Sequence, residues 1–306
     1  IHFVDEALPS SSLKKFALLN AQNGNKLYYW GNVRFEKSFT KDLAAFLSYC
    51  GFGGASAGLE VATGEGLKSI NKGTDIESVV GACAAFKKAG ILVHAYMIYG
   101  FWHDTPQSII NSMETLRQFF EAGLLDSSFW HKFMLTRNSQ VYFEWSQGEH
   151  PELHPIEPKK KNDSFFADNN LHFKGEDSYN KFGIPLESAL NSWMHGEKLD
   201  MKVQKWFDFP VPAPDIPKDF LEKLIEKYEQ KSNQIVGKDI FWLGSNPVPA
   251  VSDKNRIQYT WIYLQEEFAQ NLQSELAEIL PLLAPTQSAE IHQQILEKIK
   301  KSPELQ

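Results

Sequence analysis

Apolar runs with the length of β-strands alternate with helix-patterned segments over roughly the first 140 residues of the chain. The runs begin about 26 to 38 residues apart, which is the size of a β/α repeat. They cover residues 1–4, 27–33, 53–59, 91–99 and 128–135. Strands that alternate with helices predict a parallel sheet, either open or closed into a barrel.

The segments between these runs carry residues that start and stop helices. Thr40 precedes one helical pattern, and Gly51 follows it. Residues 74–77 fit a capping box, in which side chains satisfy the first free amides of a helix, and Gly90 closes that segment. Thr105, with a proline directly after it, predicts the start of a third helix.

The pattern changes after about residue 140. Residues 145–185 are polar and show little periodicity. The proline-rich segment 210–217 predicts an extended linker. Amphipathic patterns then predict helices over residues 219–231, 257–283 and 289–299.

We therefore expect an α/β protein, in which a partial (β/α) barrel of TIM type with parallel strands precedes a loop-rich and mainly helical C-terminal region. The expected parts are a barrel core over 1–145, an irregular and partly helical extension with the proline-rich linker over 146–215, and a helical region over 216–306. A chain of 306 residues is long enough for such an arrangement.

Composition narrows the classes of partner. The formal net charge of -7 and the scattered Lys and Arg residues argue against a nucleic-acid surface. No apolar stretch approaches the roughly 20 residues that a membrane-spanning helix needs, and no signal peptide is evident. We expect a cytoplasmic protein that binds neither nucleic acid nor a membrane.

The two cysteines, Cys50 and Cys83, each fall in an apolar row with helical spacing. That placement predicts buried thiols that act as small hydrophobic side chains. Two cysteines predict no disulfide framework, and neither has a metal-ligating neighbour at suitable spacing.

Polar or aromatic residues lie at the C-terminal end of every one of the five apolar runs. In a parallel β/α barrel the carboxyl ends of the strands carry the ligand chemistry. A row of such residues at the ends of otherwise apolar strands therefore favours a pocket. The segments are residues 5–6, 32–36, 60, 96–100 and 131–137.

The order and spacing of these segments resemble radical S-adenosylmethionine (radical SAM) enzymes, in particular those with a cobalamin-binding domain ahead of the radical core. The resemblance covers residue 1 to about residue 137. Its motifs are His2–Pro9, Trp30–Arg34, Gly58–Glu60, Lys72 and Tyr96–Phe101. By this resemblance the visible strands are numbers two to six of the barrel, and the first β/α unit lies before Ile1.

The resemblance implies an S-adenosylmethionine site in which a carboxylate meets the methionyl ammonium and a cation meets the methionyl carboxylate. Glu6 fits the first role, and Lys72 or Arg34 fits the second. Glu60 fits the ribose diol, and residues 98–101 fit an apolar slot for adenine. The full set is Asp5, Glu6, Arg34, Glu60, Lys72, Tyr96, Ile98, Gly100 and Phe101.

Four further residues near the strand ends are candidates for a substrate pocket: His94, His131, Trp30 and Trp130. The three tryptophans Trp30, Trp102 and Trp130 would cluster at the barrel mouth, either as packing or as a shield against water. The substrate itself, a small molecule or a peptide, has no signature in the sequence.

The sequence departs from the family in one respect: the three-cysteine loop that holds a [4Fe–4S] cluster does not occur among the 306 residues. We expect this chain to be a fragment of a radical SAM iron–sulfur oxidoreductase that cannot bind the cluster by itself and contains no metal ligands for it. The cluster-binding segment, and a cobalamin-binding segment if cobalamin is used, would be upstream parts of the same protein.

Two alternatives remain open. The first is a self-contained barrel hydrolase or lyase that uses Asp5, Glu6, Glu60 and nearby histidines with a divalent metal. The second is a binding module without catalytic activity.

Overall fold

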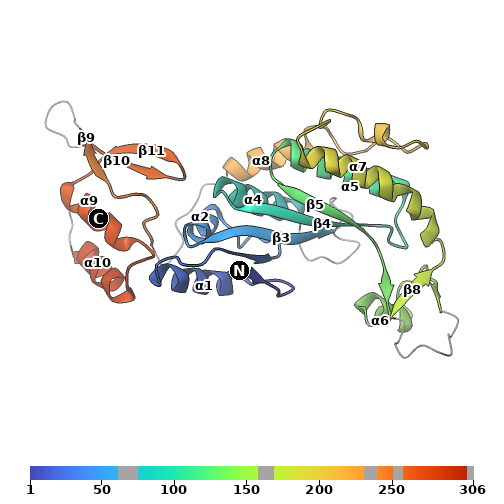
Figure 1. The fold of residues 1–306 in the computed structure, drawn as a ribbon, viewed down its shortest axis with the longest axis horizontal. Helices are drawn as coiled ribbons and strands as arrows, with labels where there is room; N and C mark the ends of the chain where they lie inside the picture. Colours follow the sequence, from blue (N-terminus) through green and yellow to red (C-terminus); the bar gives the residue numbers. More distant parts are fainter. Residues whose placement is uncertain (61–74, 158–168, 231–239, 251–257, 302–306) are drawn as a thin grey trace. The chain divides into compact units, whose positions relative to one another are not determined.

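The computed structural model describes residues 1–60, 75–157, 169–230, 240–250 and 258–301 (Figure 1). The chain divides into two compact units that interleave along the sequence. Unit 1 comprises Ile1–Ala57, Gly81–Val93 and Lys227–Gln306, and unit 2 comprises Gly58–Val80 and His94–Glu226.

A five-stranded sheet has its strands in sequential order, β1-β2-β3-β4-β5. Parallel registers join β1 to β2, β2 to β3, and β4 to β5. The prediction of an α/β fold with a parallel sheet is confirmed, and a sequential strand order is that of a partial (β/α) barrel. The strands are β1 (His2–Phe3), β2 (Tyr29–Asn32), β3 (Phe52–Glu60), β4 (Leu92–Tyr99) and β5 (Ser127–Lys132).

Helices connect these strands, as parallel pairing requires. They are α1 (Ser10–Gln22), α2 (Lys41–Tyr49), α4 (Ile76–Lys88) and α5 (Pro106–Glu121). The predicted cap at Thr40 is confirmed, because its hydroxyl accepts a hydrogen bond from the Leu43 amide at 3.3 Å. Thr105 and Ser108 form a reciprocal capping box at the start of α5.

At the start of α4 the Asp75 carboxylate accepts a hydrogen bond from the Ser78 amide at 2.8 Å. The predicted capping residue Thr74 lies outside the described residues.

Aromatic rings connect the elements of the sheet region in unit 1. Phe3 contacts Phe16 of α1 at a ring separation of 5.0 Å, and Phe16 contacts Tyr29 at 4.7 Å. Tyr29 lies 5.5 Å from Phe52, which lies 6.4 Å from Phe86 of α4. These apolar contacts bury the side of β2 and β3 that faces the helices.

The C-terminal part of unit 1 differs from its prediction in one element. The helix predicted over 257–283 is wrong for its first half, where β10 (Gln258–Tyr263) and β11 (Glu266–Asn271) form an antiparallel hairpin. Tyr259, Trp261 and Tyr263 alternate with period two, which favours a strand. Leu264 and Gln265 both have positive φ, as a two-residue hairpin turn requires.

The hairpin joins β9 (Val248–Ala250) in a three-stranded sheet. The helical elements that follow are α9 (Ser274–Ile279), the 3₁₀ turn η3 (Leu280–Leu283) and α10 (Ala289–Lys301). The helices predicted near 219–231 and 289–299 are confirmed as α8 (Phe220–Gln230) and α10.

Unit 2 contains a small sheet in addition to the helical pieces that the sequence predicted for the extension over 146–215. This sheet has the order β6-β8-β7, from β6 (Leu135–Thr136), β7 (Pro155–Ile156) and β8 (Asn170–Phe173). Its helical elements are α6 (Gln140–Ser146), η1 (Glu176–Tyr179), α7 (Asn180–Met194) and η2 (Val203–Trp206). None of the helices in the described part of the chain is long and apolar enough to cross a membrane.

A buried ion pair lies within helix α5. The Arg117 guanidinium donates to both carboxylate oxygens of Glu114, at 3.0 and 2.7 Å, and to Glu121 at 2.9 Å. It also donates to the carbonyl of Leu199. Both side chains of the Arg117–Glu114 pair are more than nine-tenths buried. Two charges in that position are stable only because each has several hydrogen-bonding partners.

Side chains of α5 also hold the proline-rich segment, which was expected to be a linker. Gln107 donates to the Ala213 carbonyl at 2.8 Å, and Asn111 accepts from the Asp215 amide at 2.9 Å. Gln118 donates to the carbonyl of Pro217 at 2.9 Å. The segment is therefore extended but is fastened along the helix, within unit 2.

The buried pair gives a stability prediction. Glu114→Ala should lower the free energy of unfolding by about 3 to 5 kcal/mol, because it leaves the Arg117 charge buried without its nearest counter-ion. Urea unfolding measures this difference. The matched control is Glu121→Ala, which removes a partner of the same arginine whose side chain is 51% exposed and should cost at most about 1 kcal/mol. Equal losses in the two variants would contradict the argument.

Candidate functional site

In unit 1 the structure brings the carboxyl ends of β1 and β2 together. The two strands run parallel, so Asp5 and Glu6 follow β1 at the same edge where Arg34 follows β2. The Asn32 side-chain amide donates to the Asp5 carbonyl at 3.3 Å, and the Leu8 amide donates to the Asn32 carbonyl at 2.8 Å. The three predicted residues at this edge, Asp5, Glu6 and Arg34, are exposed. This edge can offer two carboxylates and a guanidinium to a zwitterionic ligand.

Trp30 lies on one face of the β1–β2 ladder, stacked on His2. The ring centroids are 3.7 Å apart and the ring planes differ by 3°. The indole is 41% exposed, so this stacked pair presents a flat aromatic surface.

In unit 2 the two histidines predicted for a substrate pocket lie on the same face of the β4–β5 ladder. Tyr96 stands between them, with ring separations of 4.7 Å to His94 and 6.2 Å to His131. Phe129 lies 4.5 Å from His131 and is 49% exposed. We call His94, Tyr96, Phe129 and His131 the β4–β5 aromatic face. Ile98, which pairs in register with His131, continues this face toward the strand ends.

His94 is more buried than His131, the other histidine on this face. Its Nδ1 lies 2.8 Å from the Ser127 hydroxyl. Burial lowers the pKa of His94, and the nearby His131 lowers it further. A neutral imidazole on an aromatic surface suits an apolar or aromatic ligand better than an anion.

Trp130 does not belong to this surface, which corrects the expectation that it would line the pocket beside Trp30. It is only 3% exposed and packs against Tyr99 on the opposite side of the strands, at a ring separation of 6.2 Å. The reason is the period of a strand: Phe129 and His131 point one way, so Trp130 points the other.

The end of β4 is closed by a carboxylate that sequence analysis missed. The amides of Gly100 and Phe101 donate to Asp104 Oδ2 at 2.8 and 3.0 Å, and the Ser108 hydroxyl donates to Oδ1 at 3.1 Å. Burial raises the pKa of Asp104, although these hydrogen bonds oppose the rise. The sequence feature that could have indicated this role is the position of Asp104 directly before Thr105, where a helix starts.

These contacts limit which groups of the predicted adenine slot can bind a ligand. Phe101 is buried, and its ring lies 4.7 Å from that of Phe133. With both amides of the turn bonded to Asp104, Gly100 and Phe101 can shape the slot but do not offer those N–H groups to a ligand. Tyr96 and Ile98, the other predicted residues of the slot, are half-buried on the β4–β5 ladder.

Glu60 is the last residue of β3 and has a left-handed backbone, with φ of 62°. A non-glycine residue in that conformation costs about 1 to 2 kcal/mol. The ribose role that the resemblance implies for Glu60 stays a prediction. Lys72, the other half of that motif, lies outside the described residues.

The two cysteines do not fit an iron–sulfur cluster. Both side chains are fully buried, at an exposed fraction of 0%. Burial raises the pKa of the Cys50 thiol to about 12 and raises that of Cys83 as well. Cluster ligands are thiolates, so these thiols are in the wrong protonation state as well as too few.

No protein-family model matches the chain, and no curated protein matches it either. Among solved structures it is similar to TsrM from Kitasatospora setae, a radical S-adenosylmethionine methyltransferase, with 13% identity and a TM-score of 0.44 over 72% of this chain and 46% of that one.

Two further solved structures show a weaker likeness. Coproporphyrinogen III oxidase from Escherichia coli is 16% identical, with a TM-score of 0.37 over 58% of this chain and 43% of that one. Elp3 from Methanocaldococcus infernus is 13% identical, with a TM-score of 0.36 over 69% and 45%. The chain spans less than half the length of each of these three proteins. Likeness at this level carries no argument about function.

The turn after β4 gives a second prediction. Gly100 has φ of 84°, and a Cβ added there would lie 3.2 Å from Cβ and Cγ of Tyr179. Gly123 has φ of 65° with no atom within 4 Å of an added Cβ, so it is a matched control for backbone strain alone. Gly123→Ala should lower the free energy of unfolding by about 1 kcal/mol. Gly100→Ala should lower it by about 1 to 3 kcal/mol more, because it also overpacks the turn.

Urea unfolding of the full chain measures the free energy of unfolding of the two alanine variants. If the two alanine variants lose the same stability, then Tyr179 does not enforce glycine at residue 100.

Proposed function

We propose that this chain is the S-adenosylmethionine-holding part of a radical SAM enzyme of the cobalamin-binding subgroup. The observation that carries the proposal is the set of charged residues that follows β1 and β2 at one edge of a parallel ladder, in the order of the family's motifs. The likeness to solved radical SAM structures is in keeping with this but adds no independent weight.

The roles of the residues follow from their chemistry. Glu6 accepts hydrogen bonds from the methionyl ammonium, and Arg34 or Lys72 pairs with the methionyl carboxylate. Asp5 keeps this edge acidic beside Glu6. Glu60 accepts hydrogen bonds from the ribose hydroxyls.

The residues proposed for the adenine base all belong to unit 2. Tyr96 and Ile98 offer it an apolar contact surface, and the Gly100–Phe101 turn, fixed by Asp104, sets the depth of the slot. In the whole enzyme S-adenosylmethionine supplies a radical or a methyl group.

We further propose that the cluster comes from another part of the same protein, upstream of this sequence, together with cobalamin if it is used. The substrate then approaches the β4–β5 aromatic face. His94 and His131 are the candidates for contact with it on this face, and their aromatic character favours a substrate with a flat apolar group. Trp30 is a separate candidate, which belongs to unit 1.

Binding of S-adenosylhomocysteine tests the cofactor site without a cluster. Titration calorimetry should detect binding to the wild-type chain, and Glu60→Gln should weaken it by about tenfold, because a hydrogen bond to a charged acceptor contributes about 1.5 to 3 kcal/mol. Glu222→Gln is the control, since Glu222 is an exposed carboxylate of α8 in the same unit. Folded chain that binds no S-adenosylhomocysteine would contradict the proposal.

Anaerobic reconstitution with iron and sulfide tests the cluster. The chain should yield no stable [4Fe–4S] absorption or electron paramagnetic resonance signal, because Cys50 and Cys83 are both buried and are its only cysteines. A stable cluster signal that survives gel filtration would show that the assignment of the cluster to another segment is wrong.

A further inference from the structure

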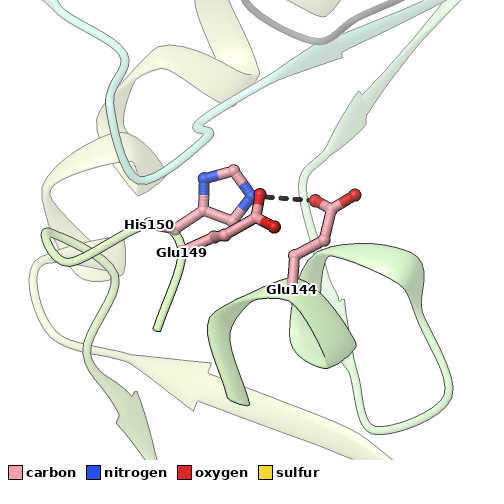
Figure 2. A group of neighbouring side chains, drawn as sticks. All are labelled: Glu144, Glu149 and His150. Carbon is pink, nitrogen blue, oxygen red and sulfur yellow. Dashed lines mark hydrogen bonds and ion pairs between the residues drawn. The ribbon is translucent and has the colours of Figure 1, made fainter. Parts of the chain in front are cut away.

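Three metal-ligating side chains come together at the end of helix α6, outside the site described above. The ligand atoms of Glu144, Glu149 and His150 all lie within 4.8 Å of one another. Figure 2 shows the His150 ring and the Glu149 carboxylate directed toward the Glu144 carboxylate, with His150 Nε2 2.9 Å from Glu144 Oε2. No other such group occurs among the residues that the structure describes.

The chain builds this cluster by folding back over the end of α6. The helix begins at the Ser139 cap, whose hydroxyl accepts from the Tyr142 amide at 3.2 Å. Gly148 and His150 both have positive φ and reverse the chain. The Glu149 amide then donates to the Glu144 carbonyl at 3.0 Å, which brings the two glutamates side by side.

Neighbouring side chains orient two of the three ligands. Gln140 donates to Glu144 Oε1 at 3.0 Å, so the other carboxylate oxygen is directed at His150. The His150 ring meets the Trp102 ring edge to face at 5.0 Å, and the Trp102 indole N–H is itself fixed by Glu152 at 2.8 Å. Metal ligands are commonly held in this way by an outer layer of hydrogen bonds and ring contacts. Glu144 and His150 are also more than two-thirds buried.

We propose that Glu144, Glu149 and His150 form a binding site for a divalent transition-metal ion, with Zn²⁺ as the best match. Two carboxylates and one imidazole suit Zn²⁺ and neutralise its charge. With metal–ligand distances near 2.1 Å, tetrahedral ligands lie about 3.4 Å apart. Small side-chain rotations therefore convert the observed cluster into a site with its fourth position open.

Binding of the metal ion replaces the contact between His150 and Glu144. His150 Nε2 gives up its contact with Glu144 and donates its lone pair to the metal, and any proton on that nitrogen is released to solvent. The site does not depend on S-adenosylmethionine, so its failure would leave the proposed function untouched.

Calorimetric titration of the full 306-residue chain with ZnCl₂ tests the site. We expect one Zn²⁺ per chain, and His150→Ala and Glu149→Gln should each weaken binding by at least about tenfold. Glu149 is exposed, so its variant keeps the fold even if His150→Ala does not. With Co²⁺ in place of Zn²⁺, the wild type should show the visible absorption of a low-coordinate site, and these two variants should not.

The matched control is His172→Ala. His172 also pairs with a carboxylate, Glu176, but it belongs to no group of three metal-ligating side chains among the described residues. This variant should bind Zn²⁺ like the wild type. If it loses as much affinity as His150→Ala, or if Glu149→Gln binds Zn²⁺ unchanged, the ion is an adventitious surface ion and the proposed site is wrong.

Discussion

Parallel strand pairing is the constraint on which the rest of this structure depends. Each strand must be followed by a connection that returns to the start of the sheet, so helices α1, α2, α4 and α5 are required between the strands. Within unit 1 the same requirement places the carboxyl ends of β1 and β2 at one edge. Glu6 and Arg34, which are far apart in sequence, therefore both follow strands that end at that edge.

Much of this arrangement could be predicted from the sequence, because local signals and tertiary structure agree there. The apolar runs mark the five strands, and the caps at Thr40 and Thr105 mark helix starts. The apolar helical rows around Cys50 and Cys83 correctly predict that both thiols are buried. These features each depend on a few adjacent residues, which a single sequence displays directly.

Other features depend on partners that the sequence does not reveal. The hairpin at 258–271 was mistaken for a helix because its apolar residues also match a helical period when the turn at Leu264 is overlooked. Asp104 is held by the amides of a turn, and Trp130, a candidate for the substrate pocket, is instead buried against Tyr99. Nothing local distinguishes the proline-rich segment from a free linker, since its attachment lies about 100 residues away on α5.

That attachment has a consequence for how the protein can change over evolutionary time. Gln107, Asn111 and Gln118 hold main-chain carbonyl and amide groups of residues 213–217, which any amino acid there except proline at residue 215 could supply. The attached residues can therefore drift freely while the three helix residues cannot. Related proteins could carry quite different loops here and still dock them in the same place, a likeness visible in coordinates and hidden from alignment.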